Sequence, residues 1–236
     1  MTRLVRSALW WAAVLGAIVG PFAPAFATTV SFLDNMDNAG QAGQYQTFTS
    51  GTGEATATVP TSGGNPGAYT NLSLNLDVNE GVNIARLWNL ASFNPSVSGA
   101  VSSVVAGYDI RRTFSNDPGA TQVARWVAIL QGGVLHLEFY GVTTNTDWEH
   151  FTSGNLVTDV PEVNWTNGGE ILFGFANSAF AGLGIPFVID GGYDNFSVNL
   201  DFTPPSGQVP EPAALVLLVS GLAGLATFAA RKTRLN

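Results

Sequence analysis

Few residues in this chain have side chains suited to catalysis. His136 and His150 are its two histidines, and it contains no cysteine. A thiol nucleophile and a cysteine-ligated metal are therefore excluded. A zinc site would need both histidines together with carboxylates. Alternation along residues 134–140 places His136 on an exposed strand face beside Glu138 and Tyr140, which favours a solvated histidine over a metal ligand.

Paired carboxylates could serve a glycosidase, and Glu138 with Asp147 or Glu149 are the nominal candidates. Sixteen acidic residues lie between Thr28 and Gln208, so chance pairs are easily formed. The sequence has no Gly-x-Ser-x-Gly elbow, no Walker A motif and no dinucleotide-binding glycine pattern. We therefore predict no catalytic residue, and a glycoside-active enzyme of the cell envelope is the alternative.

Calcium is a more suitable ligand for the acidic turns than zinc, because Ca²⁺ prefers hard oxygen donors. One cluster reads Asp34-Asn35-Met36-Asp37-Asn38, and a second reads Asp194-Asn195. If the strands beside these clusters are neighbours, Asp34, Asp37 and Asp194 could share one structural Ca²⁺. The alternative is that Asp and Asn merely favour turns through local hydrogen bonds.

Two tryptophans have surroundings that fit a sugar-stacking surface. Trp148 and Trp165 lie in polar, turn-like stretches, whereas Trp88 and Trp126 lie in apolar stretches that indicate the core. Aromatic side chains are more often core than ligand-binding. Trp148 and Trp165 are nevertheless the candidate residues for binding a polysaccharide.

Short strands must position these side chains, because no long stretch has apolar residues at helical spacing. The strongest hairpin joins residues 122–131 to 134–140 through Gly132-Gly133, a favoured two-residue turn. In its second arm Leu135, Leu137 and Phe139 are expected to face inward. Further strands are expected at 30–33, 45–50, 54–59, 68–76, 103–114, 170–175, 186–189 and 193–202, with 45–50 and 54–59 forming a second hairpin.

About ten short strands separated by Gly, Asn and Ser turns predict an all-β fold, an antiparallel β-sandwich, over residues 28–202. Gly63-Gly64-Asn65-Pro66-Gly67-Ala68-Tyr69 before one strand, and Asp190-Gly-Gly-Tyr-Asp194-Asn195-Phe-Ser-Val198 in the last, resemble the jelly-roll domains related to laminin domain IV and the carbohydrate-binding modules. The resemblance implies that the first and last strands lie together. It also implies a binding or structural module.

Charge is distributed unevenly along the 236 residues, of which only 11% are charged. Residues 28–208 hold four basic and sixteen acidic residues, a net charge of −12. Such a surface repels phosphate backbones, so nucleic acid is not expected as a partner.

The N-terminal residues 1–27 have the three parts of a signal peptide. Arg3 and Arg6 precede an apolar run, and Ala25-Phe26-Ala27 supplies small residues for signal peptidase. Cleavage is expected after Ala27, with Ala25 and Ala27 as the recognised residues. A retained N-terminal membrane helix is the alternative.

The C-terminal residues read as a membrane segment behind a short linker at 203–208. Residues 213–230 carry no charge and are long enough to span a bilayer as a transmembrane helix, and Arg231, Lys232 and Arg234 follow them. Pro212 suits the first turn of a helix. A plain anchor in the inner membrane, with the body in the periplasm, is one interpretation.

A second interpretation comes from the order of Val209-Pro210-Glu211-Pro212, an apolar helix and a basic cluster over residues 209–236. This order resembles the PEP-CTERM sorting signal of Gram-negative bacteria. The resemblance implies processing by exosortase, an integral-membrane protease, and delivery to the cell envelope, the outer surface or an extracellular polysaccharide matrix. The sequence thus predicts an exported, non-catalytic β-sandwich.

Overall fold

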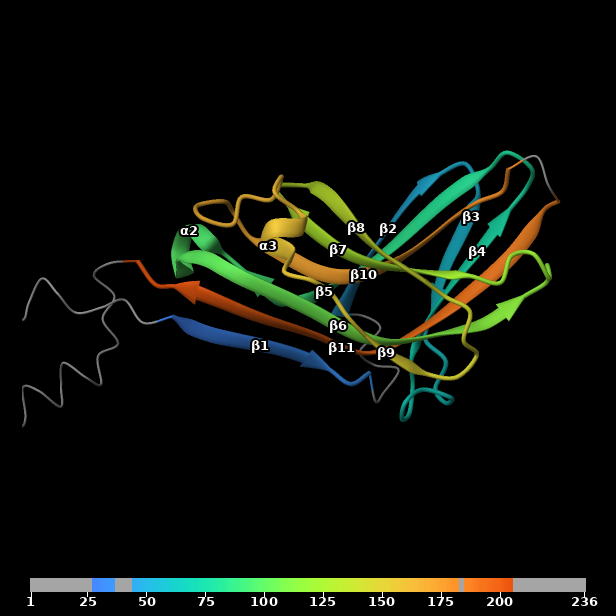
Figure 1. Cartoon of the computed structure of the whole chain (residues 1–236), viewed down its shortest axis with the longest axis horizontal. Coiled ribbons are helices and arrows are strands. Elements are labelled where there is room, and N and C mark those ends of the chain that lie inside the picture. Colours follow the sequence, from blue (N-terminus) through green and yellow to red (C-terminus); the bar gives the residue numbers. More distant parts are fainter. Residues whose placement is uncertain (1–26, 37–43, 183–184, 206–236) are drawn as a thin grey trace, which may run out of the picture. The chain divides into compact units, whose positions relative to one another are not determined.

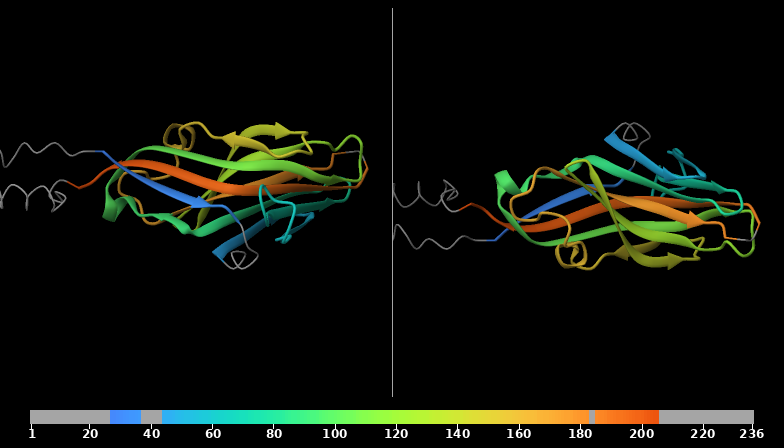
Figure 2. Two further views of the ribbon diagram at one scale, coloured as in Figure 1. Left: turned by 90° about the horizontal axis from the view of Figure 1, so that it is seen from below. Right: turned by 90° about the horizontal axis from the view of Figure 1, so that it is seen from above.

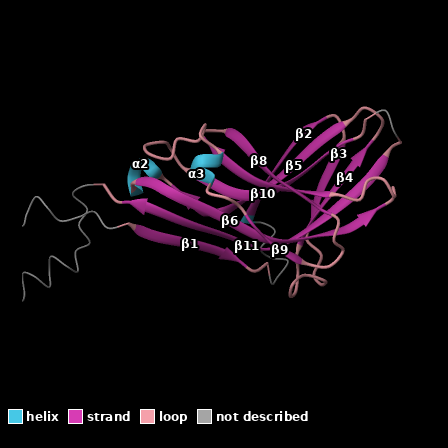
Figure 3. Ribbon diagram, in the orientation of Figure 1, coloured by secondary structure: helices cyan, strands magenta, loops and turns pink. Residues whose placement is uncertain are grey.

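The computed structural model describes residues 27–36, 44–182 and 185–205, and Thr28–Thr203 forms a compact unit (Figure 1). Strands dominate this unit, with two one-turn helices, α2 (Pro95–Ser98) and α3 (Leu156–Asp159) (Figure 3). Every strand pairing among the described residues is antiparallel, and the strands form two sheets. The predicted all-β sandwich is therefore confirmed.

The two sheets differ in size. The six-stranded sheet has the order β3 (Glu54–Thr58), β4 (Thr70–Leu76), β11 (Phe187–Thr203), β6 (Ala100–Ser115) and β9 (Glu149–Thr152), and β1 (Thr28–Asp34) pairs with β11. The five-stranded sheet has the order β2 (Tyr45–Gly51), β5 (Gly81–Phe93), β10 (Ile171–Phe180), β7 (Val123–Gln131) and β8 (Val134–Thr143).

The first and last strands lie side by side, as the jelly-roll resemblance implies. β1 pairs with β11 from Thr28 opposite Phe202 to Asp34 opposite Phe196, and Figure 2 shows the two strands adjacent. Alternation along β11 directs Phe196, Val198 and Leu200 into the core.

The core between the sheets is rich in aromatic rings. Phe175 of the five-stranded sheet stacks on Tyr193 of the six-stranded sheet, with ring centroids 4.8 Å apart and an interplanar angle of 12°. Tyr108 contacts both rings, and all three side chains are fully buried. Burial raises the pKa of the Tyr193 and Tyr108 hydroxyls, and each donates a hydrogen bond to a backbone carbonyl. These contacts join the two sheets.

Two predicted strand assignments are corrected. Residues 45–50 and 54–59 do not form a hairpin, because β2 pairs with β5 while β3 pairs with β4 in the other sheet. Gly51, at φ +112°, makes this change of sheet possible, since a Cβ there would lie 2.1 Å from the Gly81 carbonyl oxygen. Residues 186–189 and 193–202 belong to one strand, β11, which contains a bulge at Asp194.

The inward face predicted for residues 134–140 is wrong, although the hairpin itself is confirmed. Leu135, Leu137 and Phe139 pair with Leu130, Ala128 and Trp126, which lie on the outer face of the five-stranded sheet. His136 instead pairs with Ile129, a residue of the core between the sheets. The apolar alternation itself is present, but both faces of this sheet are apolar, so a period of two does not distinguish the inner face from the outer one.

Helices able to cross a membrane do not occur among the described residues. The predicted transmembrane helix 213–230 and most of the signal peptide lie outside those residues, as does all of the 203–208 linker except its first three residues. Ala27 is described and directly precedes β1.

Candidate functional site

A pocket opens in the five-stranded sheet where two adjacent strands diverge. β10 and β7 are paired from Ile171 opposite Gln131 to Ala176 opposite Trp126, and the pairing ends there. Beyond this point a pocket of about 370 Å³ lies between them. Its walls come from β7, β8, β10, the start of β11 and the loop before β7, and comprise Gly119, Ala120, Thr121, Gln122, Ala124, Trp126, Phe139, Val142, Ser178, Ala179, Phe180, Phe187 and Ile189.

An aromatic pair forms one side of this pocket. The Trp126 and Phe139 rings are 4.9 Å apart between centroids and tilted by 48°. Trp126 is partly exposed, while Phe139 is 49% exposed and Phe180 is 68% exposed. Thr121, Gln122 and Ser178 supply hydroxyl and amide groups, and no residue lining the pocket is charged. Such a cavity suits an uncharged ligand that has both an apolar face and hydrogen-bonding groups.

The pocket continues onto an apolar outer surface of the same sheet. Ala85, Leu87, Ala128 and Ala176 form its buried floor. The larger side chains packed around this floor are Phe48, Trp126, Leu130, Leu135, Leu137 and Leu172. Apolar side chains gathered on an outer sheet face suit contact with a ligand or partner.

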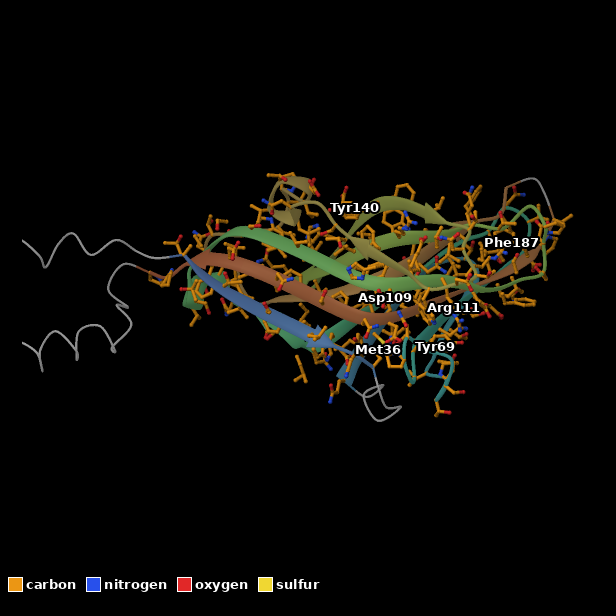
Figure 4. The ribbon with its side chains drawn as sticks, turned by 60° about the horizontal axis from the view of Figure 1, so that its bottom comes forward. Met36, Tyr69, Asp109, Arg111, Tyr140 and Phe187 are labelled. Carbon is orange, nitrogen blue, oxygen red and sulfur yellow. The ribbon has the colours of Figure 1, made fainter. Side chains whose placement is uncertain are left out.

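A second aromatic group, the Trp148 cluster, consists of Tyr69, Arg111 and Trp148 on the six-stranded sheet. The Tyr69 and Trp148 rings meet edge to face at 5.5 Å. The Arg111 guanidinium carbon lies 4.6 Å from the Trp148 ring centroid and 5.3 Å from that of Tyr69. All three side chains are partly exposed. Figure 4 shows Tyr69, Arg111 and Asp109 near one another.

Backbone contacts hold the Trp148 cluster rigidly. Trp148 Nε1 and Arg111 Nη2 both donate to the Gly63 carbonyl oxygen, at 3.1 and 2.9 Å. Gly192 of β11 lies underneath, where a Cβ would come within 3.1 Å of Trp148 and 3.2 Å of Tyr69. The rings therefore lie close over the strand backbone, and a side chain at position 192 would make them shift.

A polar network next to the cluster ties the loop before β4 to the bulge in β11. Asp109 accepts hydrogen bonds from Asn195 Nδ2 at 2.7 Å and Asn65 Nδ2 at 3.1 Å, and its other oxygen lies 2.7 Å from His150 Nδ1. Asn195 has φ +50°, a left-handed conformation that asparagine tolerates better than most residues. The Gly63–Tyr69 loop is thereby fixed against the sheet.

The structure brings Asp34 and Asp194 near the same tyrosine. Asp34 is 1% exposed and accepts hydrogen bonds from Tyr45 Oη at 2.7 Å and the Met36 amide at 2.9 Å. Asp194 is fully buried and accepts from the Asn65 and Asn195 amides, at 2.5 and 2.8 Å. Burial, the Asp34 charge and, to a smaller extent, the Asp194 charge raise the pKa of Tyr45. Asp34 therefore stabilises the end of strand β1, and Asp194 stabilises the bulge within β11.

The calcium site at Asp34, Asp37 and Asp194 stays a prediction, because Asp37 lies outside the described residues. Within the described ranges, no three His, Asp or Glu side chains gather as a metal site would require.

Two of the four described tryptophans are placed differently from the predictions. Trp165 is 5% exposed, stacks on Phe173 and donates to the Val160 carbonyl, so burial leaves it no free face for a sugar. Trp126 was expected in the core but lies on the outer sheet face. Trp148 is partly exposed as expected, and Trp88 is a core residue at 6% exposure.

The nominal glycosidase carboxylates have separate surroundings. Burial, with Asp159 and Glu162 nearby, raises the pKa of the Glu138 carboxyl. Burial alone would raise the pKa of Glu149, but hydrogen bonds from Thr143, Arg125 and Asn145 lower it. The ion pair of Glu149 with Arg125 links β9 to β7 across the two sheets, so Glu149 has an evident structural role.

Sequence reasoning did not identify the pocket residues, Tyr69 or Arg111. The sorting residues Val209, Pro210, Glu211 and Pro212 and the signal-peptide residue Ala25 lie outside the described part of the chain. The sequence does offer one indication of Arg111, because it is one of only four basic residues between Thr28 and Gln208.

No family model and no curated protein matches this chain. Comparison with solved structures found similarity to carbohydrate-binding modules. A family 11 carbohydrate-binding module from Clostridium thermocellum, in complex with a β-1,3-1,4-mixed-linked tetrasaccharide, is 9% identical and covers 75% of this chain and 96% of its own, with a TM-score of 0.43. A carbohydrate-binding module described for specific mannan recognition is 14% identical and covers 74% of this chain and 98% of its own, with a TM-score of 0.37. A third structure, of promiscuous carbohydrate-binding modules of the β-sandwich superfamily, is 13% identical and covers 72% and 73%, with a TM-score of 0.44. These similarities concern the β-sandwich fold alone.

Proposed function

We propose that this chain is an exported, non-catalytic protein that binds a neutral polysaccharide in the pocket beside Trp126 and Phe139. The observation that supports the proposal is an uncharged pocket of about 370 Å³ in which the partly exposed Trp126 and the exposed Phe139 lie next to Thr121, Gln122 and Ser178. A sugar ring has an apolar C–H face and a rim of hydroxyl groups. The aromatic pair can stack on the C–H face, and the hydroxyl and amide side chains can hydrogen-bond the sugar hydroxyls.

Charge favours a neutral polysaccharide over an acidic one. The body carries a net charge of −12, and no basic residue lines the pocket, although Arg112 donates a hydrogen bond to the Thr121 carbonyl beside it. A polyanion would therefore be repelled at long range without a compensating ion pair.

The experiment that tests this function is electrophoresis of the protein in native gels containing soluble polysaccharides. The panel holds a β-1,4-glucan, a β-1,4-mannan and a β-1,4-galactan, with polygalacturonate as the acidic comparison. At least one neutral polymer is expected to retard the protein, and polygalacturonate is not. Migration unaffected by every neutral polymer, or retardation by the acidic one alone, would contradict the proposal.

The second part of the proposal is sorting to the envelope, the outer surface or the extracellular matrix. It is supported by the order of the Val209–Pro212 motif, the apolar stretch and the basic end. Proline on both sides of a residue favours an extended backbone, and proteases generally bind peptides in that form. Signal peptidase and exosortase are the proposed processing enzymes, and the inner membrane holds the chain before processing. We also propose that the sandwich is a jelly roll, which its adjacent first and last strands support.

Replacement of Glu211 by Ala is expected to leave the C-terminal segment attached, because the variant lacks the only charge of the motif. Intact-mass measurement of protein recovered from cells with and without exosortase gives the result directly. Wild-type protein should lose the segment only where exosortase is present. Processing of the Glu211→Ala variant at the wild-type level would show that Glu211 takes no part in recognition. If mature wild-type protein retains the segment, residues 213–230 are a plain membrane anchor and not a sorting signal.

A further inference from the structure

We infer that the Trp148 cluster is a second saccharide site, and that one molecule therefore joins two polysaccharide chains. This inference rests on the proposed function of the pocket. It goes further by assigning a ligand to the six-stranded sheet and a cross-linking role to the whole sandwich.

The two aromatic groups lie on opposite outer faces. Tyr108 and Ile110 of β6 are in the core, so alternation places Asp109 and Arg111 on the outer face of the six-stranded sheet. Val127 and Ile129 of β7 are also in the core, which places Trp126 on the outer face of the five-stranded sheet. Two packed sheets, about 10 Å apart, separate these faces. A single stiff polysaccharide chain cannot lie along both, so two occupied sites mean two chains or two distant segments.

The Trp148 cluster is preorganised for binding. Tyr69 and Trp148 meet edge to face, rest on Gly192, and are held to the Gly63 carbonyl through Trp148 Nε1. Little side-chain freedom remains to be lost when a ligand binds, and this lowers the entropic cost of association. Both rings keep part of their surface open to solvent.

Arg111 supplies the polar part of this site. Among the described residues Arg111 forms no ion pair, although the body is strongly acidic. Its guanidinium lies against both rings, and Arg111 Nη2 donates a hydrogen bond to the neutral Gly63 carbonyl. A planar guanidinium has five N–H donors, so it can bond a pair of neighbouring hydroxyl groups. Asn71 and Thr113, which are hydrogen-bonded to each other at 2.7 Å, provide further polar groups beside Gly192.

The local charge again selects a neutral glycan. Asp109 and Asp190 lie on the same sheet face as Arg111, and Asp109 is held by Asn65, Asn195 and His150. The single positive charge of Arg111 does not make this sheet face basic, because Asp109 and Asp190 lie on the same face. The ligand class is therefore the same neutral polysaccharide that the pocket binds.

The test compares wild type with two double variants that each remove one site. Trp126→Ala with Phe139→Ala removes the pocket site, and Tyr69→Ala with Trp148→Ala removes the cluster. The probes are the neutral polymer that retards the protein most in native gels and a hexasaccharide prepared from it. Calorimetric titration gives the number of hexasaccharides bound per chain, and viscometry of the polymer solution reports cross-linking. Circular dichroism confirms that each variant is folded, and Arg111→Lys is a milder second variant at the cluster.

Wild type is expected to bind two hexasaccharides per chain and to raise the viscosity of the polymer. Each double variant should bind one and leave the viscosity unchanged, and Arg111→Lys should weaken one of the two sites about tenfold. One hexasaccharide per wild-type chain, with binding unaltered by the Tyr69→Ala, Trp148→Ala variant, would overturn the inference while leaving the pocket function intact. A viscosity rise with only one bound hexasaccharide would also overturn it, because self-association would then explain cross-linking. Failure of every neutral polymer to bind would instead remove the proposed function.

Discussion

Replacement of Phe175 by Ala is expected to lower the free energy of unfolding by about 3–5 kcal/mol, the range for a buried Phe replaced by Ala. Phe175 is 0% exposed and lies within 6 Å, centroid to centroid, of Tyr45, Tyr108, Tyr193 and Phe196. Its loss would leave a cavity bordered by both sheets, since rigid rings cannot collapse into the space. Urea titration followed by tryptophan fluorescence measures the change.

Phe139→Ala is the matched control for Phe175→Ala. Phe139 lies in the same sheet but on its outer face, where it is 49% exposed. Its removal should change the free energy of unfolding by about 1 kcal/mol or less, in line with a partly exposed position. Equal destabilisation by the two variants would contradict the assignment of inner and outer faces on which both binding sites depend.

Replacement of Trp126 and Phe139 together by Ala is expected to weaken saccharide binding at the pocket at least about a hundredfold. Aromatic side chains at the centre of a binding site commonly cost about 2 kcal/mol each when truncated, and each 1.4 kcal/mol corresponds to a factor of ten. The two rings touch, so their effects are not expected to add fully. Calorimetric titration with the hexasaccharide, performed in the Tyr69→Ala, Trp148→Ala background, isolates the pocket.

Thr121→Val serves as a conservative control at the same pocket, because it keeps the side-chain volume and removes one hydroxyl. It should weaken binding by about tenfold, as expected for one lost hydrogen bond. Unchanged affinity after removal of both rings would show that the saccharide binds elsewhere.

The fold class was predictable from the sequence because alternating apolar residues and glycine turns report local strand structure. The structure confirms the predicted hairpin at Gly132-Gly133 and the predicted apolar alternation along β11. β5 was missed although it lies inside the five-stranded sheet. Its sequence GVNIARLWNLASF includes Arg86, Asn83 and Asn89, which interrupt the apolar pattern. Burial lowers the pKa of Arg86, which stacks on Tyr45 inside the sandwich, and only tertiary contacts could make this position tolerable.

The binding sites were less predictable because they depend on contacts between distant strands. Trp148 stood out through its polar surroundings, but Tyr69 and Arg111 join it from a loop and strand 79 and 37 residues earlier. The prediction for Trp126 was wrong because apolar sequence neighbours indicate burial only when one face of a sheet is apolar. Both faces of this sheet are apolar. Trp165 was misplaced for the opposite reason, since its polar neighbours Asn164 and Thr166 point away while its ring packs on Phe173.

The most direct test of the binding account uses the indole N–H signals of the four described tryptophans as internal reporters. A ¹H–¹⁵N spectrum of the protein is titrated with the hexasaccharide, and the signals are assigned with single Trp→Phe variants. Trp126 and Trp148 lie on the two outer faces, while Trp88 and Trp165 lie in the core. We expect the Trp126 and Trp148 signals to shift and saturate while those of Trp88 and Trp165 stay in place. Saturating shifts confined to Trp88 and Trp165, or no shift of Trp126 at saccharide concentrations that retard the protein in gels, would contradict it.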